Sequence, residues 1–322
     1  MEKILITGAS GFIGTNLLEY YKDRFTVLNI DFEKPQNVKH IAYWKNLDIR
    51  DYNSLEKAML EFSPDYILHM AAKTDFYGKT IDDYDANTVG TENVLKVSQK
   101  ISGLKKIIIT SSQAVTGGGY QPKHQKDYKT VTIYGDSKVK TEELTWALHP
   151  NCDWAIIRPT SIWGPWFRVP YRNFFDLVHK RMYFHIGHKS TTKTYGYIGN
   201  SVYQIDRILF TDTTDENNKV FYIGDNPPIN IEDWANEIGT EMGINIHRLP
   251  IPLLKSVAWF GDILYKVAKI KFPMNSRRLH NMTLTNGNTR NLDNIYKIAP
   301  NPPYTRMQGV KDTVKWLGYN KK

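Results

Sequence analysis

Three glycines near the start of the chain constrain its fold more than any other feature. Gly8, Gly11 and Gly14 follow the apolar run Lys3–Thr7 and lead into a stretch with helical periodicity. Glycines at such a turn let the backbone approach a pyrophosphate, and the start of the next helix offers free N–H groups to phosphates. The pattern predicts a dinucleotide-binding strand, turn and helix. The expected cofactor contacts are Gly8, Ser10, Gly11, Phe12, Ile13 and Gly14.

The first half of the chain alternates short apolar runs with helical stretches. The runs are Lys3–Thr7, Thr26–Ile30, Tyr66–His69, Lys106–Thr110 and Trp154–Ile157. They lack an alternation of apolar and polar residues, which is typical of parallel strands covered on both faces. The sequence therefore predicts an α/β fold, a Rossmann-type doubly wound parallel sheet with a smaller C-terminal substrate lobe. We expect a dinucleotide-binding domain over residues 1–165, with a return near 195–225, and mainly substrate lobe over 166–322.

Composition and charge exclude several classes of protein. The chain of 322 residues has a net charge of +9, which favours anionic partners such as phosphates or an acidic membrane face. It has no zinc-finger spacing and no basic block, so nucleic acid is not an expected partner. The single cysteine, Cys152, permits no internal disulfide and no Cys-based metal site, so we expect no metal and a cytoplasmic location. Without a long apolar run or a leader-like start, neither a transmembrane helix nor a signal peptide is expected.

An acidic residue ends the second apolar run. Asp31 follows Leu28 to Ile30, where a carboxylate can accept hydrogen bonds from the adenosine ribose and repel a 2′-phosphate. This position favours NAD over NADP as the cofactor. Lys34, three residues later, is the feature that argues for a phosphate instead.

Further motifs in this half resemble the extended short-chain dehydrogenase/reductase family, also described as NAD-dependent epimerases and dehydratases. Asp48 and Ile49 occupy the place of the family's adenine-contacting pair, and Ala71 and Ala72 that of the loop against the cofactor. Asn87 belongs to a stretch similar to the central-helix signature, where a structural role is expected. The resemblance implies NAD(P)-dependent chemistry.

A tyrosine and a lysine four residues apart form the predicted catalytic pair. Tyr134 and Lys138 would share one face of a helix, so the ammonium group could lower the pKa of the phenol. The phenol could then exchange a proton with a sugar hydroxyl during hydride transfer. By the family resemblance, Ser112 is the hydroxyl that holds the substrate oxygen. Sugar 4,6-dehydratases of the family carry Asp-Glu after that hydroxyl, whereas Gln113 and Ala114 stand here, which argues against dehydration.

Substrate contacts are predicted from the loops and the C-terminal half. Tyr197 to Asn200 stands where the family often has a Tyr-Ile/Val-His-Val-Asp motif, and the arginine that often precedes it is absent. That departure leaves the recognition of a nucleotide diphosphate open. The candidate substrate-binding residues are Lys73, Gln113, Arg168, Arg172, Lys193 and Asn200.

Residues 253–272 combine apolar and basic side chains at helical spacing. Leu253, Val257, Phe260, Leu264 and Val267 recur on one face, and Lys255, Asp262, Lys266 and Lys269 fall on another. A helix with one face buried in the lobe is the preferred interpretation, and a helix lying on an anionic membrane is the alternative. The segment also resembles bacterial epimerases that act on polyprenyl-diphosphate GlcNAc.

These features favour an NAD-dependent sugar 4-epimerase acting on a nucleotide-diphosphate or polyprenyl-diphosphate sugar in polysaccharide biosynthesis. An NAD(P)H-dependent keto-sugar reductase would need the same catalytic residues, so it remains an alternative. A non-catalytic cofactor-binding scaffold is a third, although it would not need the Tyr134 and Lys138 pair. The family resemblance also implies a homodimer formed through the helices expected at 86–101 and 134–148. Peripheral contact with an anionic membrane, at its inner face, is a further expectation.

Overall fold

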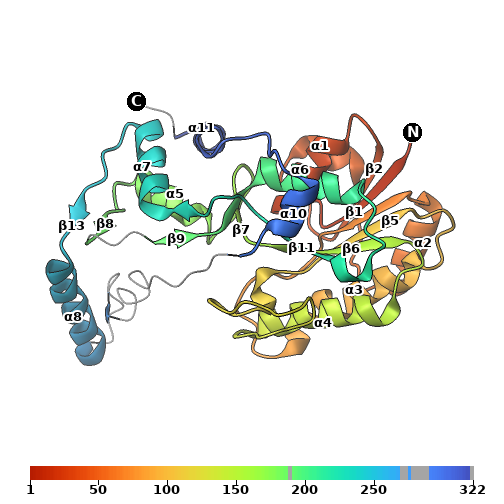
Figure 1. Ribbon diagram of the computed structural model, residues 1–322, viewed down its shortest axis with the longest axis horizontal. Coiled ribbons are helices and arrows are strands. Elements are labelled where there is room, and N and C mark those ends of the chain that lie inside the picture. Colours follow the sequence, from red (N-terminus) through yellow and green to blue (C-terminus); the bar gives the residue numbers. More distant parts are fainter. Residues whose placement is uncertain (188–190, 269–274, 277–289, 320–322) are drawn as a thin grey trace.

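The computed structural model describes residues 1–187, 191–268, 275–276 and 290–319. Its centre is a sheet of seven strands in the order β11-β6-β5-β4-β1-β2-β3 (Figure 1). Every neighbouring pair in this sheet is parallel. The strands are β1 (Lys3–Thr7), β2 (Thr26–Asp31), β3 (Trp44–Asn46), β4 (Tyr66–His69), β5 (Lys106–Thr110), β6 (Asp153–Pro159) and β11 (Val220–Ile223). The predicted doubly wound parallel sheet is confirmed.

Helices cover both faces of the sheet, which explains the uninterrupted apolar runs. Ile4 and Ile6 of β1 belong to one buried cluster and Leu5 to the other, because successive strand residues point to opposite faces. The first cluster includes α1 (Phe12–Tyr21) and α6 (Ile198–Leu209), and the second includes α2 (Tyr52–Phe62) and α3 (Asp85–Ser98). The long helix α4 (Ile133–Leu148) packs along α3.

The second lobe combines short strands with helices. Three two-stranded sheets pair β10 (Tyr195–Tyr197) with β7 (Ser161–Trp163), β12 (Ile229–Asn230) with β9 (Thr192–Lys193), and β13 (Arg248–Leu249) with β8 (His185–Ile186). Its helices are α5 (Arg172–His179), α7 (Ile231–Met242), α8 (Ile251–Ala268) and α11 (Arg306–Leu317). Trp163, Phe175 and Trp234 pack ring against ring in its core, so these aromatic residues serve packing. The chain also returns to the sheet through α6, β11 and α10 (Asp293–Ile298).

Helix α8 has one face buried in the lobe, as the preferred interpretation expects, but two residues of the predicted apolar stripe lie outside that face. Leu254 and Ala258 are buried against Leu249 and residues of β8, whereas Leu253 and Phe260 of the predicted stripe are each 51% exposed. The interpretation that this stripe is the buried face is therefore wrong for those two residues. The side chains of Val257, Leu264 and Val267 and the stretch 269–272 lie outside the described residues. No helix in the described part of the chain is long and apolar enough to cross a membrane.

Candidate active site

The glycine turn between β1 and α1 has the geometry that a pyrophosphate requires. Gly8 has a φ of +77°, and a Cβ there would lie 2.5 Å from the backbone nitrogen of Ala71. A Cβ on Gly14 would lie 2.6 Å from Cα of Ala9, so helix and turn can approach only because both residues are glycines. No side chain caps the start of α1, where Gly11 is the cap residue. The first N–H groups of α1 are therefore not taken by a side-chain cap and can bind an anion.

Asp31, the last residue of β2, accepts a hydrogen bond from the backbone of the glycine turn. Its two oxygens accept hydrogen bonds from the backbone nitrogens of Ser10 (3.0 Å) and Glu33 (2.9 Å). Burial raises the pKa of Asp31, and the hydrogen bonds from Glu33 and Ser10 oppose that effect. The carboxylate thus lies beside the turn, where it can accept ribose hydroxyls and disfavours a 2′-phosphate.

Asn29 is a buried residue of this region that the sequence did not reveal. Its Oδ1 accepts from the backbone nitrogen of Ala9 at 3.1 Å, and its Nδ2 donates to Ser10 Oγ at 3.2 Å. An asparagine inside an apolar strand could have signalled a partner, but nothing local identifies which one. It fixes the two residues that follow Gly8.

Of the two residues predicted to contact adenine, Asp48 lies near the surface and Ile49 lies in the core. Asp48 is partly exposed and forms an ion pair with Arg50, which lowers the pKa of that carboxyl. Ile49 is buried and fills the space beside Gly90 of α3, where a Cβ would meet its Cδ1 at 2.5 Å. Ala71, which packs against Gly8, and Ala72 follow β4. The cofactor contacts of these four residues remain predictions.

The three predicted catalytic residues lie together at the carboxyl end of β5. Ser112 lies close enough to Tyr134 to lower the pKa of its phenol, and Lys138 Nζ donates to the carbonyl oxygen of Thr110 at 2.8 Å. Tyr134 and Lys138 occupy the first half of α4, one turn apart, and both side chains are buried. Phe76 and Tyr84 contact the ring of Tyr134 at centroid distances of 5.2 and 6.0 Å. The site is thus a pair of hydroxyls beside a buried lysine.

Burial dominates the electrostatics of this cluster. Burial raises the pKa of Tyr134 to about 12, and the nearby Ser112 offsets part of that rise. Burial lowers the pKa of Lys138 to about 7, against the opposing effect of Glu142. Desolvation is thus the largest influence on the phenol in the protein chain by itself, and the expected effect of Lys138 beside the cofactor ribose stays a prediction.

His69, the first residue of the stretch that resembles the family's cofactor loop, is a second buried residue whose contacts the sequence did not reveal. Its ring nitrogens lie 2.7 Å from Thr7 Oγ1 and 3.0 Å from Thr91 Oγ1. Burial, with a further contribution from Lys138, lowers the pKa of His69 to about 3. The imidazole is therefore neutral, and it joins β1, β4 and α3 beneath the lysine.

Asn87 has the structural role that the family resemblance implied. Its side chain bonds to both backbone groups of Lys73, at 2.8 and 2.9 Å, and to Ser137 Oγ at 2.9 Å. These bonds join the loop after β4 to α4. Lys73 Nζ lies over the ring of Tyr84, 5.3 Å from its centroid, and so stays close to the Tyr134 cluster. Gln113, next to Ser112, donates to Ser161 Oγ at 3.3 Å.

The other candidate substrate residues are engaged elsewhere. Arg168 donates to the carbonyl oxygen of Ser10 at 3.3 Å and pairs with Glu33 at 3.0 Å, so it contacts the cofactor turn. Arg172 pairs with Asp176 on its own helix. Lys193 lies in β9, opposite Ile229.

Asn200 requires a correction. Its Nδ2 donates to Asp225 at 2.9 Å and to the carbonyl oxygen of Tyr304 at 3.0 Å, and its Oδ1 accepts from the Tyr304 nitrogen at 3.0 Å. Asn200 is also buried. Both polar groups of its amide are therefore satisfied within the fold, and its predicted substrate contact is replaced by a structural role.

Arg290 is a third residue that no local signal predicted. It donates to the carbonyl oxygens of Tyr120 at 3.1 Å and Thr116 at 3.0 Å, and so holds both ends of the glycine-rich loop 117–119. Among the described residues, no group of three or more His, Cys, Asp or Glu side chains is placed to hold a metal ion.

The turn, the start of α1 and Asp31 fit a dinucleotide without a 2′-phosphate. Gly8 and Gly14 leave space that a Cβ would fill, and Asp31 supplies the ribose acceptor. When NAD is bound there, it accepts and returns a hydride. Tyr134, Ser112 and Lys138 lie at the carboxyl ends of the same parallel strands, where ligands bind in such folds.

Comparisons with known proteins agree with this site. Residues 4–223 match the model of the NAD dependent epimerase/dehydratase family. An N-acetyl-alpha-D-glucosaminyl-diphospho-ditrans,octacis-undecaprenol 4-epimerase from Escherichia coli O157:H7 is 29% identical, over 98% of this chain and 95% of that protein. A UDP-glucose 4-epimerase from Vibrio cholerae is 26% identical, over 78% of this chain and 79% of its own length.

Solved structures share the fold at lower identity. The NAD complex of a UDP-glucuronic acid 4-epimerase from Bacillus cereus has a TM-score of 0.73 and 19% identity, covering 98% of this chain and 96% of its own. A UDP-glucose 4-epimerase from Thermotoga maritima has a TM-score of 0.75 and 18% identity, covering 98% of both chains. The chain therefore belongs to the NAD-dependent epimerase/dehydratase family, and its cofactor is NAD.

Proposed function

We propose that this protein is an NAD-dependent 4-epimerase of a diphosphate-linked sugar of the GlcNAc/GalNAc or Glc/Gal type. The observation that carries the proposal is the buried pair of Tyr134 and Lys138 with the half-buried Ser112 next to Tyr134. Gln113 and Ala114 follow Ser112 where an elimination would use an acidic pair, so water loss has no general acid and base there.

The chain's own residues would handle the proton at the sugar C4 oxygen. Ser112 Oγ binds that oxygen and Tyr134 Oη removes its proton, so that the C4 carbinol becomes a ketone as its hydride leaves. After the keto sugar turns its other face to the site, the hydride returns to C4 and Tyr134 returns the proton to the same oxygen. Because burial holds the pKa of Tyr134 at about 12, the phenol needs a nearby positive charge to act as a base near neutral pH.

We favour a polyprenyl-diphosphate carrier for the sugar. The relative from E. coli O157:H7, whose printed name includes the undecaprenol carrier, aligns over 98% of the chain, whereas the V. cholerae UDP-glucose enzyme aligns over 78%. The described contacts also engage Arg168 with the cofactor turn and Arg172 with Asp176, which leaves neither arginine as an evident nucleotide ligand. A nucleotide carrier is the second candidate because UDP-sugar 4-epimerases share the fold.

The proposed setting is polysaccharide or glycolipid assembly at the cytoplasmic side of a membrane. The sugar diphosphate is the small-molecule partner, and the net charge of +9 suits a protein that works near phosphates. We also propose a homodimer, formed through α3 and α4. These helices pack along each other, and Val89 on α3 is 45% exposed.

The test is to incubate the purified protein with catalytic NAD and no reductant, in parallel with polyprenyl-diphosphate GlcNAc and with UDP-GlcNAc. NMR of the sugar shows whether the galacto epimer forms. We expect the epimer with the polyprenyl substrate and no net change in NADH. If neither substrate is epimerised and a keto sugar is instead reduced with stoichiometric loss of NAD(P)H, the protein is a reductase.

A further inference from the structure

Helix α8 has one buried side and another side on which three large apolar side chains are half exposed or more. Leu254 and Ala258 are buried in a small cluster with Phe184, Ile186 and Leu249. Away from that cluster, Leu253 is 51% exposed, Trp259 65% and Phe260 51%. Half or more of each large apolar side chain is therefore accessible on a helix that is already anchored to the protein by its other side.

Most of the exposed apolar residues of α8 lie on one face, whereas Tyr265, which is 52% exposed, lies on the opposite side. At about 100° per residue, Leu253, Trp259, Phe260 and the half-buried Ile263 fall within about 120° of the circumference. The exposed residues Lys255 and Lys266 lie beside Trp259, at the edge of that face. An apolar face with a tryptophan at its edge and lysines next to it is typical of helices that lie in the headgroup region of a bilayer.

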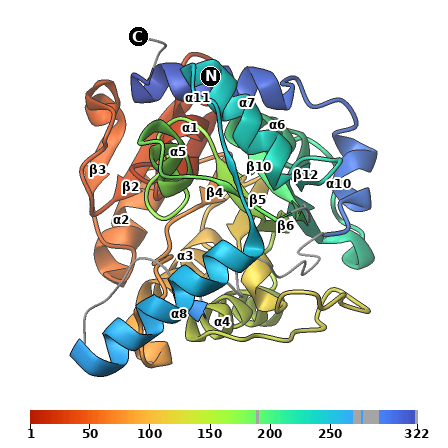
Figure 2. The same cartoon turned by 90° about the vertical axis from the view of Figure 1, so that its left-hand side faces the viewer.

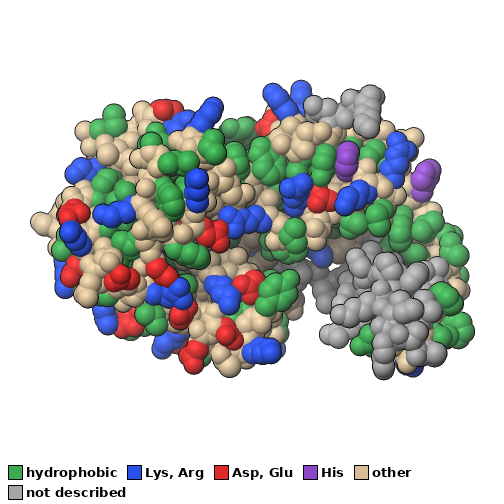
Figure 3. Space-filling view, turned by 180° about the vertical axis from the view of Figure 1, so that it is seen from behind, with side chains coloured by type: hydrophobic (Ala, Val, Ile, Leu, Met, Phe, Trp, Pro, Cys, Tyr) green, Lys and Arg blue, Asp and Glu red, His purple; other side chains and the backbone are tan. Residues whose placement is uncertain are grey.

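The position of α8 in the molecule suits contact with a large flat surface. Figures 1 and 2 show the helix at the lower end of the substrate lobe, projecting from it. It lies on the same lower side as α4, the helix that carries Tyr134. In the opposite view, hydrophobic side chains gather around this end of the lobe (Figure 3).

We propose that α8 docks on a bilayer containing anionic phospholipid, with Leu253, Trp259 and Phe260 inserted between the headgroups and Lys255 and Lys266 against their phosphates. The net charge of +9 complements such a surface. Docking does not depend on the reaction. Its use, which is to hold the active site close to a lipid-linked sugar, rests on the proposed function. Two weak signals, apolar insertion and basic attraction, together give stable but reversible attachment.

The test is flotation of the full-length protein with vesicles of phosphatidylglycerol and phosphatidylethanolamine, and with vesicles of phosphatidylcholine alone. We expect the protein to float with the anionic vesicles and at least tenfold less with the neutral ones. The triple variant Leu253→Ser, Trp259→Ser, Phe260→Ser should lose at least tenfold in vesicle binding. Lys255→Glu with Lys266→Glu should lose about fivefold or more for each lysine.

A matched control separates insertion from a general loss of apolar surface. Val38, which is 71% exposed and lies in a short helix next to β3, becomes serine in that control, and flotation should not change. All variants should keep the melting temperature and bound NAD of the wild-type protein. The proposal is overturned if the wild-type protein does not float with the anionic vesicles, or if the triple variant floats as well as the wild-type protein. It is also overturned if the triple substitution instead abolishes self-association, because α8 would then bind a second copy.

An activity assay with detergent-solubilised substrate distinguishes failure of the docking proposal from failure of the proposed function. The triple variant should epimerise the polyprenyl substrate in detergent at the wild-type rate, and at least tenfold more slowly when the substrate is in vesicles. Flotation without any epimerisation would leave docking intact and overturn the proposed function instead.

Discussion

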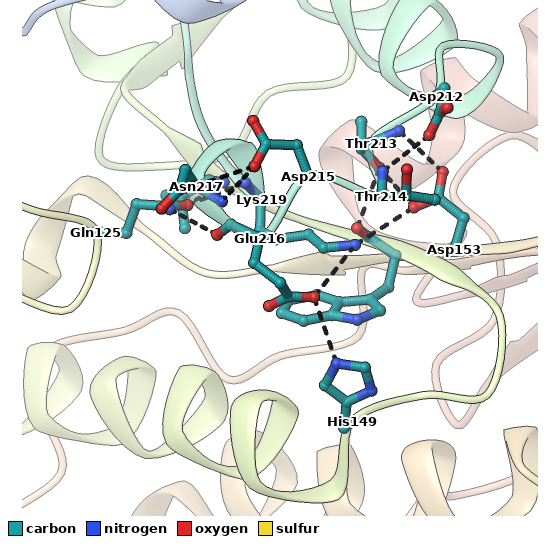
Figure 4. A network of polar contacts seen from close by, with 12 residues as sticks. Gln125, His149, Asp153, Asp212, Thr213, Thr214, Asp215, Glu216, Asn217 and Lys219 are labelled. Carbon is teal, nitrogen blue, oxygen red and sulfur yellow. Dashed lines mark hydrogen bonds and ion pairs between the residues drawn. The ribbon is translucent and has the colours of Figure 1, made fainter.

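Both ends of the parallel sheet contain buried lysines, but only one end pairs them with carboxylates. At the amino end, Asp153 at the start of β6 lies 2.9 Å from Lys106 Nζ and 3.5 Å from Lys219 Nζ. Figure 4 shows the surrounding network, in which Thr213 donates to Asp153 at 2.8 Å. At the carboxyl end, Lys138 donates to a backbone carbonyl, and within the described ranges it forms no ion pair.

The difference shows how the fold separates stability from chemistry. The shared carboxylate at the amino end offsets part of the cost of burying two ammonium groups, although burial still lowers the pKa of Lys106. These two lysines join β5, β6 and β11. Lys138 lacks such compensation, and burial lowers its pKa to about 7. A buried lysine with a perturbed pKa beside two hydroxyls is typical of a reaction site. The two ends should therefore respond differently to substitution.

The largest expected effect is on catalysis at the carboxyl end. Tyr134→Phe keeps the ring contacts with Phe76 and Tyr84 but removes the proton carrier. We expect kcat to fall about 10²- to 10⁴-fold with NAD binding retained. Steady-state epimerisation and bound NAD are the measurements, with Tyr20→Phe as a control on the outer side of α1. Wild-type kcat in Tyr134→Phe would remove this residue from the mechanism.

Lys138 should leave a signature in the pH dependence of stability. Its folded pKa of about 7 lies below the ordinary value of about 10.4, so between these pH values the unfolded chain holds a proton that the folded chain does not. Stability of the NAD-free protein should therefore rise with pH in this window by up to about 1.4 kcal/mol per pH unit, relative to Lys138→Met. Denaturant unfolding at several pH values measures the difference. A difference that does not change with pH would mean that Lys138 is charged when buried.

At the amino end the expected effect is on stability and not on turnover. Asp153→Asn leaves Lys106 and Lys219 without their shared charge, and partial exposure of Asp153 reduces the cost to about 3 kcal/mol of unfolding free energy. Denaturant unfolding checks the loss, and kcat of the folded variant should equal that of the wild type. Asp215→Asn, in the exposed turn nearby, is the control and should change neither. A large fall in kcat for Asp153→Asn would contradict the division between the two ends.

The smallest expected effect concerns the cofactor turn. Arg168→Ala removes the hydrogen bond to Ser10 and the ion pair with Glu33. Because both contacts are partly exposed to solvent, NAD affinity should weaken by about fivefold or less. Isothermal titration with NAD measures it. Arg172→Ala, which disrupts only the contacts of α5 with Asp176 and Tyr319, should leave the affinity unchanged. Equal losses for both variants would argue against a specific role for Arg168 at the turn.

How far the sequence could predict the molecule depends on how local each signal is. The apolar runs of β1, β4 and β5 and the spacing of Tyr134 and Lys138 are local patterns, and the structure places them as predicted. Asn29, His69 and Arg290 act through partners up to 174 residues away, and no nearby residue identifies those partners. The periodicity of α8 similarly predicted an apolar face without showing which side the lobe would cover.

The central claim is that hydride leaves and returns to C4 of one sugar within one closed site. It is tested most directly by epimerising substrate that carries deuterium at C4, in ordinary water with catalytic NAD and no reductant. We expect the galacto product to keep its deuterium and no NADH to accumulate. Product with hydrogen at C4, or turnover that consumes reduced cofactor in proportion to product, would contradict it.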